Sequence, residues 1–287
     1  MKKLLAAIFL ALLCNFSYAQ DISSSLLWKI SGPELEEPSY LYGTIHLICQ
    51  NEVVISETMK AAFDSTDQLI MELDMDNPNL QTEMQQYSFN KNSENIIDLL
   101  SEDDIVVVDS FLRQNYNTEL AQIGIFKPQV LSSMIMMKIL PCERVGSLEF
   151  ELLRMAAARE IEVIGLETVR YQMSLFDSIP RTEQVKWMVE MVKDLDESKK
   201  ELVELTKIYQ EQDIDKIYEH TTELPEYAEY EGLFLSNRNL NWIPIIEENI
   251  KKMSSFIAVG AGHLGSDMGV VKLLHDKGYI LEPIYME

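Results

Sequence analysis

The sequence is short of basic residues, and this shortage limits what the protein can bind. Lysine and arginine together number 24 against 47 aspartate and glutamate residues, which gives a formal net charge of -23. Because phosphate contacts require lysine or arginine, such a surface argues against binding to nucleic acid or to an anionic membrane. The simplest interpretation of the acidity is that it keeps the protein soluble.

Long apolar runs are also missing beyond the first twenty residues, so we expect no stable insertion into a membrane. The chain begins with two lysines (residues 2–3), a short apolar stretch (residues 4–13) and a small-x-small cleavage motif (residues 17–19). This order predicts a signal peptide over residues 1–19 and export to the periplasm or the medium. Lipid anchoring through Cys14 is the lesser alternative, because the preceding leucine is a poor residue before a lipidated cysteine.

Cysteine is scarce as well, with three residues in the whole chain. Once the signal peptide and Cys14 are removed, only Cys49 and Cys142 remain. Two cysteines in an exported protein favour one disulfide, and two buried thiols are the alternative.

Two glycine-histidine motifs dominate what the sequence does contain. Residues 41–47 and 258–264 are apolar runs that each lead into Gly-x-x-His, ending in His46 and His263. With 11 glycines and 4 histidines in 287 residues, about 0.15 such spacings are expected by chance. An apolar run of this kind is typical of a buried strand, and the glycine permits a close approach of backbone or ligand. We therefore interpret the two histidines as halves of one site.

The hydrophobic pattern predicts an α/β fold with a mixed sheet and a helical insert. Apolar runs at residues 26–31, 40–45, 68–74, 162–167, 256–259 and 279–285 indicate strands. Helical spacing dominates two further segments, at about residues 80–140 and 180–230. We expect residues 20–287 to form a single domain into which these helical segments are inserted.

Four of the predicted strands end in residues suited to metal chemistry: His46, Glu72, Glu167 and His263. In open α/β sheets, functional groups gather at the carboxyl ends of strands. Two histidines and a carboxylate can hold a divalent ion such as Mn, Co or Zn and leave room for water and substrate. We predict His46, His263 and Glu72 as ligands, with Glu72 or Glu167 as the carboxylate that serves catalysis. The alternative is that Glu72 only pairs with an arginine such as Arg238.

The pair Arg238-Asn239 lies in a predicted helix over residues 232–252 that Pro244 should kink or restart. A guanidinium is a rigid fork that can hold an oxyanion or a carboxylate, so both residues are candidates for substrate positioning. Equally, Arg238 could pack beside Trp242, one helical turn further on.

These motifs together resemble the TraB/PrgY/GumN family, which includes the Tiki proteins that cleave Wnt. The resemblance covers about residues 27–285 and rests on five stretches in a specific order: 42–46, 71–74, 165–168, 238–242 and 260–263. It implies a fold similar to the erythromycin-esterase/ChaN-like group and a metal-dependent hydrolase. The paired Gly-x-x-His motifs of the family fall on His46 and His263, and its acidic positions on Glu72 and Glu167. Its Arg-Asn pair falls on Arg238 and Asn239.

The resulting hypothesis is an exported metal-dependent hydrolase, with peptidase activity as the leading possibility and a peptide or small molecule as substrate. One rival is a non-catalytic protein of the same fold that binds a peptide, a pheromone or a haem-like ligand. A second rival is a metal-free, esterase-like hydrolase in which one histidine acts as the base. A serine nucleophile has no support, because Gly-x-Ser-x-Gly is absent.

Overall fold

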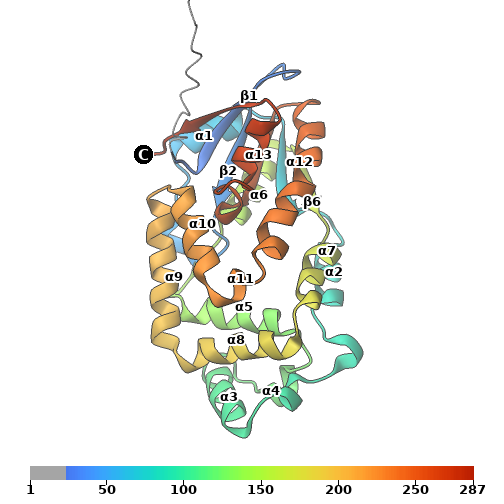
Figure 1. Ribbon diagram of the computed structural model, residues 1–287, viewed down its shortest axis with the longest axis vertical. Helices are drawn as coiled ribbons and strands as arrows, with labels where there is room; N and C mark the ends of the chain where they lie inside the picture. Colours follow the sequence, from blue (N-terminus) through green and yellow to red (C-terminus); the bar gives the residue numbers. More distant parts are fainter. Residues whose placement is uncertain (1–23) are drawn as a thin grey trace, which may run out of the picture.

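The computed structural model describes residues 24–287, apart from the side chains at 225 and 226. The predicted signal peptide and Cys14 lie outside the described residues. A sheet flanked by helices forms one end of the molecule, and a layer of helices forms the other (Figure 1). No helix in the described part of the chain is long and apolar enough to cross a membrane.

In the part of the chain that the structure describes, six strands form one sheet in the order β6-β4-β7-β2-β1-β8. These strands are β1 (Leu27–Ser31), β2 (Ser39–Thr44), β4 (Gln68–Leu73), β6 (Glu162–Glu167), β7 (Ser255–Gly260) and β8 (Ile280–Ile284). β1 pairs antiparallel with β2 and β8, whereas β6, β4, β7 and β2 run parallel. The predicted mixed sheet of an α/β protein is thus confirmed, and each predicted strand is found to within one residue at either end.

The core lies on both faces of this sheet. β7 is buried along its whole length and β4 along nearly all of it, as expected for parallel strands covered on both sides. The covering helices are α1 (Glu57–Asp64), α6 (Leu148–Arg159), α12 (Asn237–Ile250) and α13 (Val270–Asp276). Ser56 caps α1 by accepting a hydrogen bond from the backbone of Met59. The sheet is therefore a rigid support for residues at its edge.

The two segments predicted to be helical are helical, and they have a hydrophobic cluster of their own. Their helices, with α7, which follows β6, are α2 (Leu80–Tyr87), α3 (Glu102–Tyr116), α4 (Leu120–Ile123), α5 (Pro128–Ile139), α7 (Val169–Leu175), α8 (Arg181–Lys193), α9 (Leu195–Gln210), α10 (Ile214–Glu223) and α11 (Pro225–Ala228). α3, α5 and α8 pack together through buried side chains such as Leu112, Ile135 and Met188. That these helices are an insert in a single domain stays a prediction.

Short irregular turns complete the structure. They are η1 (Gln50–Glu52), η2 (Lys91–Ser93), η3 (Ile96–Leu99), η4 (Phe176–Ser178), η6 (Ala261–His263) and the π-helical η5 (Gly232–Ser236). The sequence places a kink or restart at Pro244, but α12 continues through that residue without a restart. The segment just before Arg238, η5, is π-helical, and turns of this kind are frequent at functional sites.

A disulfide joins Cys49 to Cys142, as expected from the cysteine count, with the two Cα atoms 5.8 Å apart. It lies beside a short antiparallel ladder of β3 (Ile48–Cys49) and β5 (Val145–Gly146). The bridge therefore ties the segment that follows His46 to the segment that leads into α6.

Replacing both bridging cysteines with serine is expected to lower the free energy of unfolding by about 3–5 kcal/mol, because the bridge closes a long loop in the unfolded chain. The sequence separation of 93 residues sets the size of that loop. Urea unfolding of the oxidised wild type beside the Cys49→Ser/Cys142→Ser variant measures the difference. A loss of less than about 1 kcal/mol would show that the bridge contributes little to stability.

Candidate functional site

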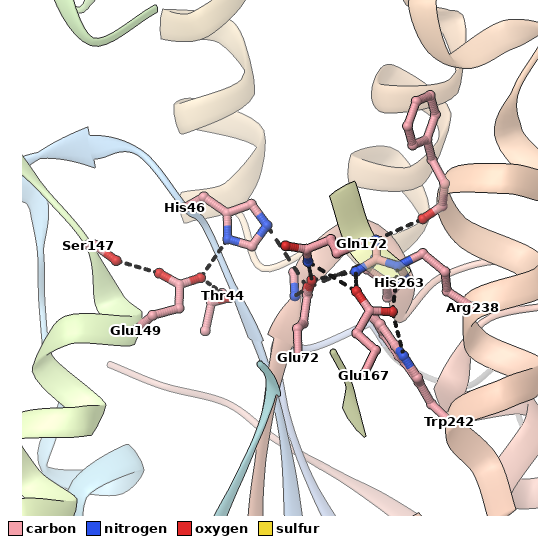
Figure 2. Close-up of polar contacts among 12 residues, drawn as sticks. Thr44, His46, Glu72, Ser147, Glu149, Glu167, Gln172, Arg238, Trp242 and His263 are labelled. Carbon is pink, nitrogen blue, oxygen red and sulfur yellow. Dashed lines mark hydrogen bonds and ion pairs between the residues drawn. The ribbon is translucent and has the colours of Figure 1, made fainter. Parts of the chain in front are cut away.

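The carboxyl ends of four adjacent parallel strands meet at one edge of the sheet. β6 ends at Glu167, Glu72 is the penultimate residue of β4, and β2 and β7 lead into His46 and His263. Figure 2 shows the four side chains facing one another across this edge. Strand pairing thus brings together residues nearly 220 positions apart in the sequence. β2 pairs with β7 in a register that places Thr44 opposite Gly260.

His46, Glu72 and His263 surround a small open space above Gly260. The Nε2 atoms of both histidines lie 3.9 Å from Oε1 of Glu72, which accepts a 2.9 Å hydrogen bond from the backbone N–H of Gly260. A Cβ added at Gly260 would lie 3.3 Å from Nε2 of His46 and 3.4 Å from Oε1 of Glu72. The glycine of the second motif therefore keeps this space free.

Arg238 neutralises both carboxylates from α12. Its Nη2 donates to Glu72 at 2.6 Å and to Glu167 at 2.7 Å, and its Nε donates to Glu167 at 3.1 Å. Its Nη1 donates to the Phe234 carbonyl in η5 and to Nε2 of His263, both at 3.0 Å. All five N–H groups are thus engaged within the protein, and none is left to hold a substrate. The guanidinium also lies over the ring of Trp242, at 4.7 Å from its centroid.

Asn239 fixes the orientation of His263. Because Nε2 of His263 accepts from Arg238, the proton is assigned to Nδ1, which donates to Oδ1 of Asn239 at 2.6 Å. The Asn239 amide donates in turn to the carbonyls of His263 and Met268. Burial and the neighbouring charge of Arg238 lower the pKa of His263 to about 3. His263 is therefore a neutral imidazole at neutral pH, and Asn239 supports it rather than a substrate.

The two carboxylates that share Arg238 have different proton affinities. Burial acts to raise the pKa of Glu72, but Arg238, the two histidines and the hydrogen bond from Gly260 together outweigh burial and hold this pKa well below its ordinary value. Burial raises the pKa of Glu167, and the negative charge of Glu72 adds to this, although Arg238 opposes both. Glu72 is thus the ionised member of the pair and Glu167 the more readily protonated one.

Glu149, which the sequence analysis missed, holds His46. Its Oε1 lies 2.7 Å from Nδ1 of His46 and accepts a hydrogen bond from Thr44, while its Oε2 accepts one from Ser147. Figure 2 shows this group on the far side of His46 from Glu72. No strand-end motif marks Glu149, which is in the first turn of α6. The available signal was the predicted disulfide, which brings this segment beside His46.

Burial acts to lower the pKa of His46, but the hydrogen bond and charge of Glu149, with Glu72 beyond it, outweigh burial and raise the pKa above its ordinary value. The side chain is 63% exposed, so solvent screens these charges in part. With Nδ1–H directed at Glu149, Nε2 is the ring atom that faces Glu72 and the open space.

Replacing Glu149 with glutamine should lower the pKa of His46 toward its ordinary value of about 6.5, because the charge is lost while the shape is kept. An NMR titration of the ring in chelator-treated protein measures this pKa.

Since the folded-state pKa of His46 is raised, the stabilisation from the His46–Glu149 pair is fully present below about pH 6.5 and is lost as the pH rises through the folded pKa. The difference in unfolding free energy between wild type and variant should therefore shrink above pH 6.5. Glu151→Gln on the same helix is the control, and an unchanged pKa of His46 in Glu149→Gln would contradict the assignment.

A cavity of about 260 Å³ opens beside His46. Its polar wall consists of Thr44, His46, Glu72, Ser147, Glu149 and Gln172, and its apolar wall of Met71, Leu73, Met75, Ala258 and Val259. Gln172, also missed from the sequence, donates from Nε2 to both Glu72 and Glu167. Arg238, Asn239 and His263 do not line this cavity, so His46 is the histidine that a ligand would meet first.

Within residues 24–287, no three His, Cys, Asp or Glu side chains lie close enough together, as they stand, to enclose a metal ion. The 3.9 Å separations and the hydrogen bond from Arg238 to His263 account for this. The donor set itself nevertheless suits a transition metal, because two imidazoles and an ionised carboxylate surround the space that a Cβ at Gly260 would fill.

Comparison with known proteins gives one family. The family described as "TraB/PrgY/gumN family" matches residues 26–283. A zebrafish (Danio rerio) protein named "Metalloprotease TIKI2" is 32% identical over 91 residues, which are 31% of this chain and 18% of the relative. The match thus spans less than a fifth of that relative. No solved structure matches the chain, so a relationship to the erythromycin-esterase/ChaN-like group stays a prediction.

Proposed function

Because the chain belongs to the TraB/PrgY/gumN family, we propose that it is an exported metal-dependent hydrolase that acts on peptides. The observation that carries this proposal is the arrangement of His46, Glu72 and His263 around the space above Gly260. The similar zebrafish protein is named a metalloprotease, which supports the same chemistry for the shared segment.

The proposed ligands are His46, Glu72 and His263, with Mn, Co or Zn as the ion. A bound ion would acidify a water and polarise a carbonyl. Glu149 fixes the tautomer of His46 so that Nε2 is the ligand atom, and Asn239 supports His263 from behind. Binding would require His263 to release its hydrogen bond from Arg238.

The remaining residues prepare the site for proton transfer and for a polar substrate. Glu167 is the carboxylate that holds a proton more readily, so we propose it as the group that takes up a proton during hydrolysis. Arg238 holds Glu72 and Glu167 in place by pairing with both, and its charge acts to lower the pKa of each. Export is part of the proposal, because a disulfide between Cys49 and Cys142 suits an oxidising compartment.

A peptide-library cleavage screen tests this function. The mature protein is assayed as purified, after exhaustive chelation, and after Mn, Co or Zn is added back. We expect cleavage that disappears on chelation and returns with one of these ions. Absence of cleavage, combined with stabilisation by an added ligand, would instead favour the non-catalytic binding protein.

A metal-free hydrolase is the second candidate, and a specific observation favours it. Arg238 engages Nε2 of His263 and Oε2 of Glu72, so Nε2 of His46 is the ring nitrogen that faces the cavity, and it can accept a proton once His46 is deprotonated above its raised pKa. A histidine held by a carboxylate, as His46 is by Glu149, is a common general base. This candidate predicts turnover that survives exhaustive chelation.

Replacing Gly260 with alanine should weaken metal binding and turnover while leaving the fold intact. The new Cβ would occupy the space between His46 and Glu72 at distances of 3.3 and 3.4 Å, and the backbone at Gly260 is one that alanine adopts readily. Titration calorimetry with Mn and Zn and the peptide assay measure the effect.

The matched control is Gly262→Ala, two residues further on. Its Cβ would meet its nearest neighbour, Thr221, at an ordinary 3.7 Å. We expect wild-type binding and turnover in this control. If Gly260→Ala kept the metal affinity of the wild type, the ion would have to bind at a place other than the space above Gly260.

A further inference from the structure

The apolar half of the cavity beside His46 comes from two adjacent strands of the sheet, β4 and β7. Its wall is formed by alternate residues of β4 and its extension, Met71, Leu73 and Met75, together with Ala258 and Val259 of β7. Met71, Ala258 and Val259 are each only 1% exposed and belong to the main core. Leu73 and Met75 are half-buried, so they are the members of this wall that a ligand can contact.

The charged groups of the cavity offer nothing to an acidic substrate side chain. Neither lysine nor arginine is among the residues that line it. The oxygens of Glu149 accept from Thr44, His46 and Ser147, and those of Glu72 accept from Arg238, Gln172 and Gly260. These donors compete with a basic side chain for the carboxylate oxygens, and an acidic side chain would meet two carboxylates without a free cation.

We infer that this cavity receives an apolar side chain adjoining the bond to be cleaved and excludes an acidic one, with Met75 setting the size limit. The inference rests on the proposed hydrolase, since the same cavity contains His46 and Glu72. Its volume of about 260 Å³ is enough for one large side chain and not for several. Methionine is flexible, so the wall should tolerate leucine, methionine or phenylalanine rather than select one of them.

The test uses matched peptides that differ only at the two positions flanking the cleaved bond, with leucine, phenylalanine, alanine or aspartate at each. At one of these positions, wild-type kcat/KM should be at least about 10-fold higher for leucine than for alanine or aspartate, as is usual for a hydrophobic pocket. Met75→Trp should remove this preference by lowering kcat/KM for leucine about 10-fold while changing the alanine peptide little. Met75→Ala should instead improve phenylalanine relative to leucine. Met84→Trp, on α2 and 37% exposed, is the control.

Failure of the inference and failure of the hydrolase give different results. Cleavage with equal rates for leucine and aspartate would overturn the inference and leave the hydrolase standing. If no peptide is cleaved, saturation-transfer NMR with N-acetyl-leucinamide and its aspartate counterpart tests the preference of the cavity independently of catalysis. Binding of the leucine probe that is lost in Met75→Trp would support it, and equal or absent binding of both probes would overturn it.

Discussion

Replacing His46 with alanine is expected to reduce peptide hydrolysis by about 100- to 10,000-fold, the usual range for loss of a group that handles the reacting proton or water. The expected loss is the same whether His46 is a metal ligand or the base of a metal-free reaction, because Nε2 faces the cavity in both cases. The variant also loses the pair with the mostly buried Glu149, so its free energy of unfolding should fall somewhat, even though 63% of the His46 side chain is exposed. Steady-state kinetics and urea unfolding of the same preparations measure both quantities.

His275→Ala is the matched control, because this histidine is also exposed and lies on α13 away from the strand ends. It should retain wild-type turnover. Turnover of His46→Ala within threefold of wild type would rule out both hydrolytic mechanisms at this site and would show that the catalytic group lies elsewhere in the protein.

Replacing Arg238 with methionine should lower the free energy of unfolding by about 3–5 kcal/mol, the usual cost of leaving buried charges unpaired. The side chains of Arg238, Glu72 and Glu167 are only 8%, 11% and 4% exposed. Without the guanidinium, burial would raise the pKa of both carboxylates above the unfolded value of about 4.3. The folded variant would then take up protons as the pH falls. The difference in unfolding free energy between wild type and variant should therefore narrow from pH 7.5 toward pH 5.

Urea unfolding at both pH values measures this deficit, and Arg170→Met, an exposed arginine on α7, is the control. A deficit that stays constant between pH 7.5 and 5 would show that the carboxylates are not what Arg238 stabilises. A deficit below about 1 kcal/mol would show that the ion pairs contribute no more than surface pairs do.

The sequence was sufficient to predict the sheet. It was also sufficient to predict that four side chains lie together at one edge of it: His46, Glu72, Glu167 and His263. Strands buried on both faces are nearly continuous apolar runs, so their ends are visible as the first polar residues, and parallel strands put those ends on one edge. The alternatives raised for Glu72 and Arg238 were also informative: Glu72 does pair with Arg238, and Arg238 does pack against Trp242.

What the sequence could not supply were the partners that come from other segments. Glu149 and Gln172 lie in helices, where a lone polar residue resembles any solvent-facing position. Likewise, Arg238 and Asn239 looked available for substrate, because the hydrogen bonds that engage them depend on η5 and on the loop at Met268. Whether the hydrogen-bonding groups of a side chain are already engaged depends on tertiary packing, and it leaves no local pattern in the sequence.

The most direct test of the proposed metal site is the metal content of the purified mature protein, wild type beside His46→Ala, after dialysis against added Mn, Co or Zn. Elemental mass spectrometry gives the stoichiometry. If His46, Glu72 and His263 hold an ion, the wild type should contain close to one ion per chain and the variant far less. No specific metal in the wild type, or equal metal in both proteins, would contradict the metal-dependent site and leave the His46–Glu149 pair as the remaining hydrolytic mechanism.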